Sequence, residues 1–283
     1  MAALAGAQGR GRAAGGEGMS SLCAIICVRN EAGYLPALLE HLSAEGVEAA
    51  FIDNGSDDGT EEIIRAALGH GVCRIASLPY DGSFNLTAQL EAKAVMAQEL
   101  PHAWLLHQDA DEILQHNVPG KRLTDLVEDA EADGANAINF DEFVFLPPEA
   151  EPKRPHREWT GYYFFEPHPM RLMRLWQRDC NLDNLRHAGH KLEGDLRLLE
   201  GNHILRHYIG LSAAHLTNKY VGRKFAQQDQ EKGWHRNRLD LAEAMLNPER
   251  VPASCLLHLA DFKSRDFVRT NPWYLHYWQR SFN

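Results

Sequence analysis

Apolar runs alternate with helix-like patterns from residue 20 to about residue 145. The first run, LCAIICV at residues 22–28, is apolar at every position, as expected for a strand that is covered on both faces of a sheet. Residues 34–46 then place four leucines on one helical face before Gly46 stops the helix. Strands that alternate with helices predict an α/β fold in which most strands are parallel, joined by right-handed crossovers, with helices on both faces of the sheet.

The same alternation continues toward the middle of the chain. Further strands are predicted at residues 47–53, 72–78 and 103–108, and further helices at 61–68 and 85–100. Thr60 is placed to cap the helix at 61–68. After residue 135 the pattern changes to a strand-like run at 135–147, a long Pro- and aromatic-rich loop, and then short strands mixed with polar helices. Since no sharp linker separates the two parts, residues 146–283 are expected to elaborate the same domain.

Polar clusters follow three of the predicted strands at the point where each strand ends. They are Arg29-Asn30-Glu31 after the first strand, Asp53-Asn54 after the second, and Asp109 to Glu112 after the fourth. Ligands of open parallel sheets bind beyond the carboxyl ends of the strands. The three loops are therefore expected to converge on one crevice, and this convergence is more informative than any single motif.

The strongest of the three motifs is Asp109-Ala110-Asp111. Residues two apart in extended backbone point to the same side, so the two carboxylates repel each other unless a cation lies between them. Mn²⁺ or Mg²⁺ suits an all-oxygen site that also takes diphosphate oxygens. The alternative is a solvated acidic turn or a helix N-terminus, where such residues are common. We interpret Asp109 and Asp111 as metal ligands.

The other two loops are weaker signals. Arg29, Asn30 and Glu31 are expected to face a nucleotide base and ribose, although Glu31 fits equally well as a first-turn acid that opposes a helix dipole. Asp53 or Asn54 is expected to meet the edge of the base, although Asn54-Gly55 also forms a turn without any ligand.

Composition narrows the function classes. The chain has 283 residues, 44% of them hydrophobic, and a formal net charge of −10, which argues against general nucleic-acid binding because that needs a basic surface. The five scattered cysteines lack a C-x-x-C pair, fit a reducing cytoplasmic location, and are interpreted in the first strand as small buried hydrophobes. No run is long and apolar enough for a membrane helix. Residues 1–18 lack the apolar segment of a secretion signal and are expected to form a disordered tail, so that Met19 is a candidate start.

Three stretches in this order and spacing, AIICVRNEAGYL, FIDNGSDDGT and WLLHQDADEIL, resemble family 2 glycosyltransferases of the GT-A fold. The resemblance covers residues 20–145. The DADE form and the later HAGHKLEG and LRHYIGLSAAHLTNKY stretches are similar to a bacterial branch with a D-A-D-E metal motif that is related to family 92.

The resemblance implies a nucleotide-sugar donor, with a UDP-sugar as the first expectation, an Mn²⁺ or Mg²⁺ ion, and inversion at the anomeric carbon. It divides the domain into a nucleotide-sugar half at 19–145 and an acceptor side at 146–283. Carried over, Asp53 contacts the base, Asp109 the ribose or metal, and Asp111 the metal and diphosphate.

The sequence departs from the family pattern at three points. Asn54 replaces the second acid of the usual pair, YDGSFNLTAQ lacks an expected arginine, and no motif of processive polymerases is present, which favours single sugar additions.

The second half is rich in histidine, and most of these are expected to be surface or internally bonded residues. His203 and His207 lie four apart, but in a strand-like run and without the glutamate of a metalloprotease helix. Because GT-A enzymes often bring a C-terminal histidine to the metal, the resemblance favours His207 as a third ligand. His190 is the alternative, as a residue that faces the acceptor.

An inverting transfer needs a base that takes the proton of the acceptor hydroxyl. Glu142 is the first candidate, because a charge among the aromatic residues of a strand is costly unless it has a function. Asp141, Glu193 and Asp195 remain open, and an edge-strand charge is an equally good interpretation.

The sequence therefore predicts a metal-dependent glycosyltransferase that acts on a glycan or lipid-linked acceptor. One alternative is a nucleotidyltransferase, which normally has a Gly-rich loop with Lys or Arg where this chain has Arg29-Asn30-Glu31. The other is a sugar-nucleotide-binding protein without catalysis. Measuring turnover of the donor with and without acceptor would distinguish such a protein from a glycosyltransferase.

Overall fold

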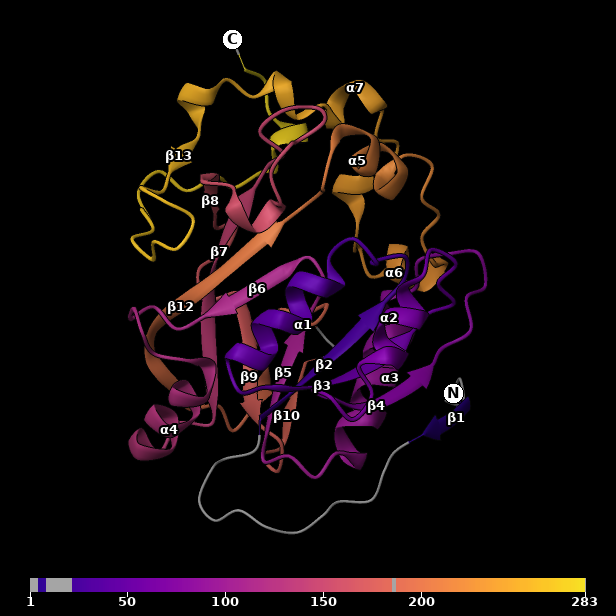
Figure 1. Cartoon of the computed structure of the whole chain (residues 1–283), viewed down its shortest axis with the longest axis vertical. Coiled ribbons are helices and arrows are strands. Elements are labelled where there is room, and N and C mark those ends of the chain that lie inside the picture. Colours follow the sequence, from indigo (N-terminus) through magenta and orange to yellow (C-terminus); the bar gives the residue numbers. More distant parts are fainter. Residues whose placement is uncertain (1–4, 9–21, 185–186, 283) are drawn as a thin grey trace.

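A mixed sheet of eleven strands forms the centre of the computed structural model, which describes residues 5–8, 22–184 and 187–282. The main path runs β1-β4-β3-β2-β5-β9-β7-β12-β6, with β8 paired to β7 and β13 paired to β8 (Figure 1). The strands are β1 Ala5–Gln8, β2 Leu22–Val28, β3 Glu48–Asp53, β4 Val72–Ser77, β5 Trp104–Gln108, β6 Glu112–Gln115, β7 Ala137–Phe145, β8 Gly161–Phe165, β9 Leu172–Gln177, β12 Leu198–Tyr208 and β13 Leu257–His258. A separate two-stranded ribbon pairs β10 Leu182–Asp183 with β11 Glu193–Gly194.

Seven α-helices and five 3₁₀ turns are assigned in the described residues. The helices are α1 Leu35–Ala44, α2 Thr60–Ala66, α3 Leu86–Glu99, α4 Leu123–Asp133, α5 Ala213–Tyr220, α6 Gln227–Glu231 and α7 Glu243–Leu246. The 3₁₀ turns are η1 His156–Glu158, η2 Arg236–Arg238, η3 Pro248–Arg250, η4 Ala253–Cys255 and η5 Tyr277–Gln279. None of the described helices is both long and apolar enough to cross a membrane.

The two faces of β2 bury different side chains, as the period of two in a strand requires. Ala24 and Ile26 pack in one core with α1, α2 and α4, whereas Cys23 and Ile25 pack in a second core with α3. Helices thus cover both faces of the sheet. Because β4, β3, β2 and β5 are mutually parallel, the predicted α/β fold is confirmed, with its parallel part in the first half of the chain.

Strands from the second half of the chain complete the same sheet. β9 lies between β5 and β7 and is antiparallel to both, and β12 is parallel to β7. A third apolar cluster, which includes Tyr163, Trp273, Tyr277 and Trp278, packs the C-terminal residues against β7 and β8. In Figure 1 the C-terminal segment, in yellow, lies with β8 and α7 at the top of the molecule, above the parallel strands.

The helix starts are close to their predicted positions, with one correction. Asn85 caps α3, because its side chain accepts a hydrogen bond from the backbone N–H of Ala88. Thr60, predicted to cap the next helix, is instead the first residue of α2, and the cap position is Gly59 with φ 93°. The Thr60 hydroxyl accepts a hydrogen bond from the backbone N–H of Glu31 and so joins the loops that follow β2 and β3.

The expected tail at residues 1–18 falls only partly within the described residues. Ala5–Gln8 forms β1, which pairs antiparallel with β4 at one edge of the sheet, and the rest of the tail lies outside the described residues.

We expect the fold to be acid-sensitive below pH 6.5 because buried neutral histidines are numerous. Burial lowers the pKa to about 4 at His41, His156, His203, His215 and His235. Between their ordinary pKa and this lowered value the unfolded chain binds more protons than the native chain, so the free energy of unfolding falls as the pH falls. For His41 alone, the linkage amounts to about 2 kcal/mol between pH 7 and pH 5.

Urea unfolding at pH 7 and pH 5 measures this effect. His41→Gln should reduce the loss of stability between the two pH values, whereas His70→Gln, which alters an exposed histidine, should not. An unchanged pH dependence in His41→Gln would show that this imidazole does not contribute.

Candidate active site

A cavity of about 680 Å³ opens at the carboxyl ends of β2 and β5. Arg29, Glu31, Asp109 and Asp111 line it, together with residues from the second half of the chain. Among the described lining residues, seven are Lys or Arg and five are Asp or Glu, although the whole chain has a formal net charge of −10. This local excess of cations favours an anionic ligand.

Asp111 lies at the centre of an ion-pair network inside this cavity. Its Oδ2 is 2.6 Å from Lys219 Nζ and 3.3 Å from His207 Nε2. Burial alone would raise the pKa of Asp111, but the positive charges of Lys219 and His207 outweigh it and hold the pKa below the ordinary value. The carboxylate is therefore charged at neutral pH.

His207 connects Asp111 to Glu142. The Nδ1 atom of His207 is 2.6 Å from Glu142 Oε1, and Arg171 Nη2 is 2.8 Å from Glu142 Oε2. Burial opposes charge on both groups. The carboxylates of Asp111 and Glu142 nevertheless raise the pKa of His207 well above its ordinary value, and Arg171 with His207 lowers the pKa of Glu142. Both Glu142 oxygens are thus engaged, and the imidazole is held with Nε2 toward Asp111.

Asp109 is more exposed and has different partners. Its side chain is 46% exposed, and its oxygens lie 3.5 Å from Lys93 Nζ and 3.6 Å from Arg174 Nη2. The same Arg174 Nη2 is 2.7 Å from Glu112 Oε1. Within the described residues, Asp109, Asp111 and His207 do not bring three ligand atoms within 4.8 Å of one another.

Two further carboxyl groups in the cavity have raised pKa values. Burial raises the pKa of Glu31 to about 7 against the opposing charge of Lys219, and it raises the pKa of Glu112 to about 7 against that of Arg174. The Oε2 atom of Glu31 has no hydrogen-bond partner among the described residues. Of the two, Glu31 is the one with an oxygen available to a ligand.

The sequence pattern of glycosyl transferase family 2 matches residues 23–175, which is more than half of the chain. The chain belongs to glycosyl transferase family 2. The matched region runs from β2 to β9 and contains Asp109, Asp111 and Glu142. None of the curated proteins matches the chain.

Solved structures with similarity to this family 2 chain are distant. TarS of S. aureus has 13% sequence identity and a TM-score of 0.40, over 77% of this chain and 43% of that one. A structure of TarS residues 1–349 in complex with UDP has 13% identity and a TM-score of 0.42, over 77% and 71% of the two chains. Glucosyl-3-phosphoglycerate synthase from Mycobacterium tuberculosis, in complex with Mn²⁺, UDP and glucosyl-3-phosphoglycerate, has 15% identity and a TM-score of 0.29, over 46% and 45%. The chain thus spans less than half the length of the full TarS chain.

Three residues that were expected to contact the nucleotide do not line the cavity of this family 2 member. The Asp53 carboxylate accepts hydrogen bonds from the backbone of Gly55 and Ser56, and Asn54 Nδ2 donates to the carbonyl of Leu78. Asn30 is bonded to Asp57 by both its side-chain oxygen and its nitrogen. Their polar groups are used to build the loops, whereas Arg29, Glu31 and Asp109 face the cavity.

The alternative base candidates also lie outside the cavity. Asp141 is on the opposite face of β7 from Glu142, where it pairs with Arg269 and Asn202. Glu193 contacts His187, and Asp195 contacts Arg197. Of the four carboxylates considered from the sequence, only Glu142 lines the cavity.

The two other histidines singled out in the sequence differ in position. His203 is buried on β12, packs edge-on against His116 with ring centroids 4.9 Å apart, and does not line the cavity. His190 does line the cavity, so it is placed to contact a bound ligand.

Sequence reasoning missed the cations of the site. Lys93 is buried on α3, and its Nζ lies 3.1 Å from His107 Nε2 and 3.2 Å from the carbonyl of Gln108. It stands three residues after Leu90 on the apolar face of the predicted helix, where a lysine signals a buried partner. Arg171, Arg174 and Lys219 gave no such local signal, because their partners come from distant parts of the chain.

Proposed function

We propose that this family 2 member transfers a sugar from a nucleotide-sugar donor, with a UDP-sugar as the first expectation, to a glycan or lipid-linked acceptor, with inversion at the anomeric carbon. The observation that supports this most is the cation-rich cavity around Asp109 and Asp111 at the carboxyl ends of parallel strands. A relation to the D-A-D-E branch near family 92 remains a prediction from the sequence.

The cations of the cavity suit a diphosphate leaving group. Lys219, Arg171 and Arg174 line the same cavity, and fixed positive charges stabilise the charge that develops as the sugar departs. In the resting protein these cations pair with Asp111, Glu142 and Glu112. The carboxylates hold the cationic side chains in place within a buried site.

The donor atoms also suit a divalent ion. Asp111 Oδ2 and His207 Nε2 are 3.3 Å apart, close to the roughly 3 Å between neighbouring ligands of an octahedral ion with bonds near 2.1 Å. A carboxylate behind the imidazole, here Glu142, is the usual arrangement of a metal-binding histidine. We propose that Asp111 and His207 hold Mn²⁺ or Mg²⁺, with Asp109 as a further ligand; the imidazole would ligate in its neutral form, so binding of the ion would release the Nε2 proton to solvent. Such an ion would supply positive charge to the departing diphosphate.

Two carboxylates are candidates for the base that accepts the acceptor proton. Glu142 was predicted from the sequence, but its lowered pKa and its two engaged oxygens suit the orientation of His207 better. Glu31 has a pKa of about 7 and an oxygen without a partner among the described residues, which suits a general base at neutral pH. Measurement of kcat against pH for Glu31→Gln and for Glu142→Gln shows which of the two carboxylates acts as the base.

Binding of a nucleoside diphosphate should depend on metal. The carboxylates of Asp109 and Asp111 repel the phosphates unless a cation lies between them. Calorimetric titration with UDP, GDP and dTDP should show one preferred nucleotide in Mn²⁺ and an affinity weaker by about tenfold or more in EDTA. With a nucleotide-sugar of the preferred nucleotide as donor, release of the sugar from the diphosphate should require the acceptor.

Lys219→Met tests the competing cation, since Lys219 contacts the same Asp111 oxygen that we assign to the metal. This variant should bind Mn²⁺ more tightly without nucleotide, whereas Lys224→Met, at an exposed lysine outside the cavity, should not. Equal UDP affinity in Mn²⁺ and EDTA, together with loss of binding in Lys219→Met, would show that the lysine replaces the metal. Absence of binding by any nucleoside diphosphate would contradict the proposed function.

A further inference from the structure

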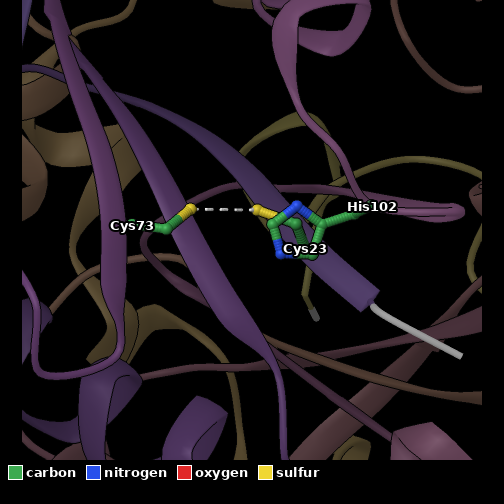
Figure 2. Close-up of side chains that lie close together, drawn as sticks. All are labelled: Cys23, Cys73 and His102. Atoms are coloured by element: carbon green, nitrogen blue, oxygen red, sulfur yellow. Dashed lines mark hydrogen bonds between the residues drawn. The ribbon is translucent and has the colours of Figure 1, made fainter. Parts of the chain in front are cut away.

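A second group of metal-binding side chains lies outside the cavity. Cys23 on β2, Cys73 on β4 and His102 in the loop before β5 place one ligand atom each within 4.8 Å of one another. Figure 2 shows the two sulfurs facing each other, with the imidazole beside Cys23. Among the described residues, this is the one such set of three or more Cys, His, Asp or Glu side chains.

The separation of the two sulfurs fits two thiolates on one zinc ion. Cys23 Sγ and Cys73 Sγ are 3.8 Å apart, although β3 lies between their strands. Zn–S bonds of about 2.3 Å in tetrahedral geometry place two sulfurs about 3.8 Å apart. In the resting structure the two thiols interact directly, and that contact is the main cause of the lowered pKa of Cys73.

The histidine supplies an independent indication of a ligand. His102 is 3% exposed, and its Nε2 lies 2.7 Å from Glu48 Oε2. Its Nδ1 is buried and has no hydrogen-bond partner among the described residues. A carboxylate on one ring nitrogen, with the lone pair of the other nitrogen unused, is the arrangement of a histidine that is held ready for a metal. A buried nitrogen without any partner is otherwise costly.

We propose that Cys23, Cys73 and His102 bind a Zn²⁺ ion through Sγ, Sγ and Nδ1. Two sulfurs and one imidazole nitrogen form a soft donor set that selects zinc over Mg²⁺ or Mn²⁺. The Glu48 side chain is 56% exposed, so solvent reaches this side of the group and a water molecule can fill the fourth position. Binding releases the thiol protons to solvent, and no redox partner is needed.

The place of the site in the fold indicates a structural role. Cys23 and Cys73 lie at the amino-terminal ends of β2 and β4, whereas the cavity opens at the carboxyl ends of the parallel strands. A zinc ion here joins β2, β4 and the segment that leads into β5 across the intervening β3. It therefore stabilises the parallel half of the sheet without contact with the reacting groups.

Metal analysis of the reduced 283-residue chain tests the proposal. Protein stripped with chelator and titrated with Zn²⁺ alone should bind one ion tightly at this site, apart from any ion held by Asp111 and His207, and gain several degrees in Tm. Co²⁺ in place of Zn²⁺ should give a thiolate charge-transfer absorption. Cys73→Ser and His102→Gln should lose the tight ion and the gain in Tm, and Cys73→Ser should lose most of the absorption.

Matched controls separate this site from the other thiols and from the cavity. Cys255→Ser and His70→Gln alter exposed residues and should retain zinc. Asp111→Asn should also retain it. If a variant does not fold, alkylation of the wild-type thiols in the presence and absence of Zn²⁺ tests the same site. Bound zinc should protect Cys23 and Cys73 from the alkylating reagent. Equal zinc binding by Cys73→Ser, no binding by the wild type, or a Cys23–Cys73 disulfide in the chain that excludes the ion would each overturn the proposal.

Discussion

Asp111→Asn should lower kcat/KM for sugar transfer by on the order of 10²–10³-fold while the chain stays folded. The carboxylate is the shared partner of Lys219 and His207 and a proposed ligand of the divalent ion. Asparagine keeps the size of the side chain but removes the negative charge, so the site loses its attraction for the ion. Steady-state kinetics at saturating Mn²⁺, with circular dichroism as a check on folding, measures the effect.

Asp129→Asn is a matched control for this substitution. Asp129 Oδ2 is 2.7 Å from Lys121 Nζ and 3.4 Å from His116 Nε2, which repeats the Lys and His contacts of Asp111 at a site outside the cavity. Both variants therefore lose a carboxylate that contacts a lysine and a histidine, but only Asp111→Asn should lose activity. Full activity of Asp111→Asn at saturating metal would refute the proposed metal site.

Glu142→Gln should lower kcat by roughly 10²-fold, because the side chain either takes the acceptor proton or fixes His207. The two roles differ in their effect on metal. A base should leave Mn²⁺ affinity unchanged, whereas loss of the carboxylate behind His207 should weaken it by about 10- to 100-fold. Since both Glu142 oxygens are engaged, we expect the affinity for Mn²⁺ to fall together with kcat.

Asp141→Asn provides the control at the neighbouring position. Both acids are buried on β7 and paired with an arginine, Asp141 with Arg269 and Glu142 with Arg171, but they face opposite sides of the strand. Asp141→Asn should retain most of its activity and its Mn²⁺ affinity. If this variant loses as much activity as Glu142→Gln, the assignment of the reacting side of β7 is wrong.

The local elements could be predicted because each is encoded by neighbouring residues. The continuous apolar run of β2 and the leucine face of α1 reflect burial that repeats with the period of a strand or a helix. The carboxyl ends of parallel strands lie at one edge of a sheet, so the sequence also indicated a crevice shared by Glu31 and Asp109. For Asp53 and Asn54 the same reasoning stays a prediction: in the structure their polar groups bond their own loop and they do not line the cavity, and turn residues of this kind have the same sequence pattern as residues that bind a ligand.

The tertiary structure alone decided which side chains meet. In the parallel register of β7 and β12, Leu205 lies opposite Glu142, so His207, two residues further along β12, reaches Glu142 on the same face. Lys219 contacts Asp111 across 108 residues of sequence, and Cys23 meets Cys73 across an intervening strand. Neither contact could be predicted from hydrophobic periodicity in the sequence, because each depends on how the strands pack and in which order they pair. The sequence thus determined the elements and the edge of the sheet that carries the site, and packing between distant segments decided its charges and its second group of metal-binding residues.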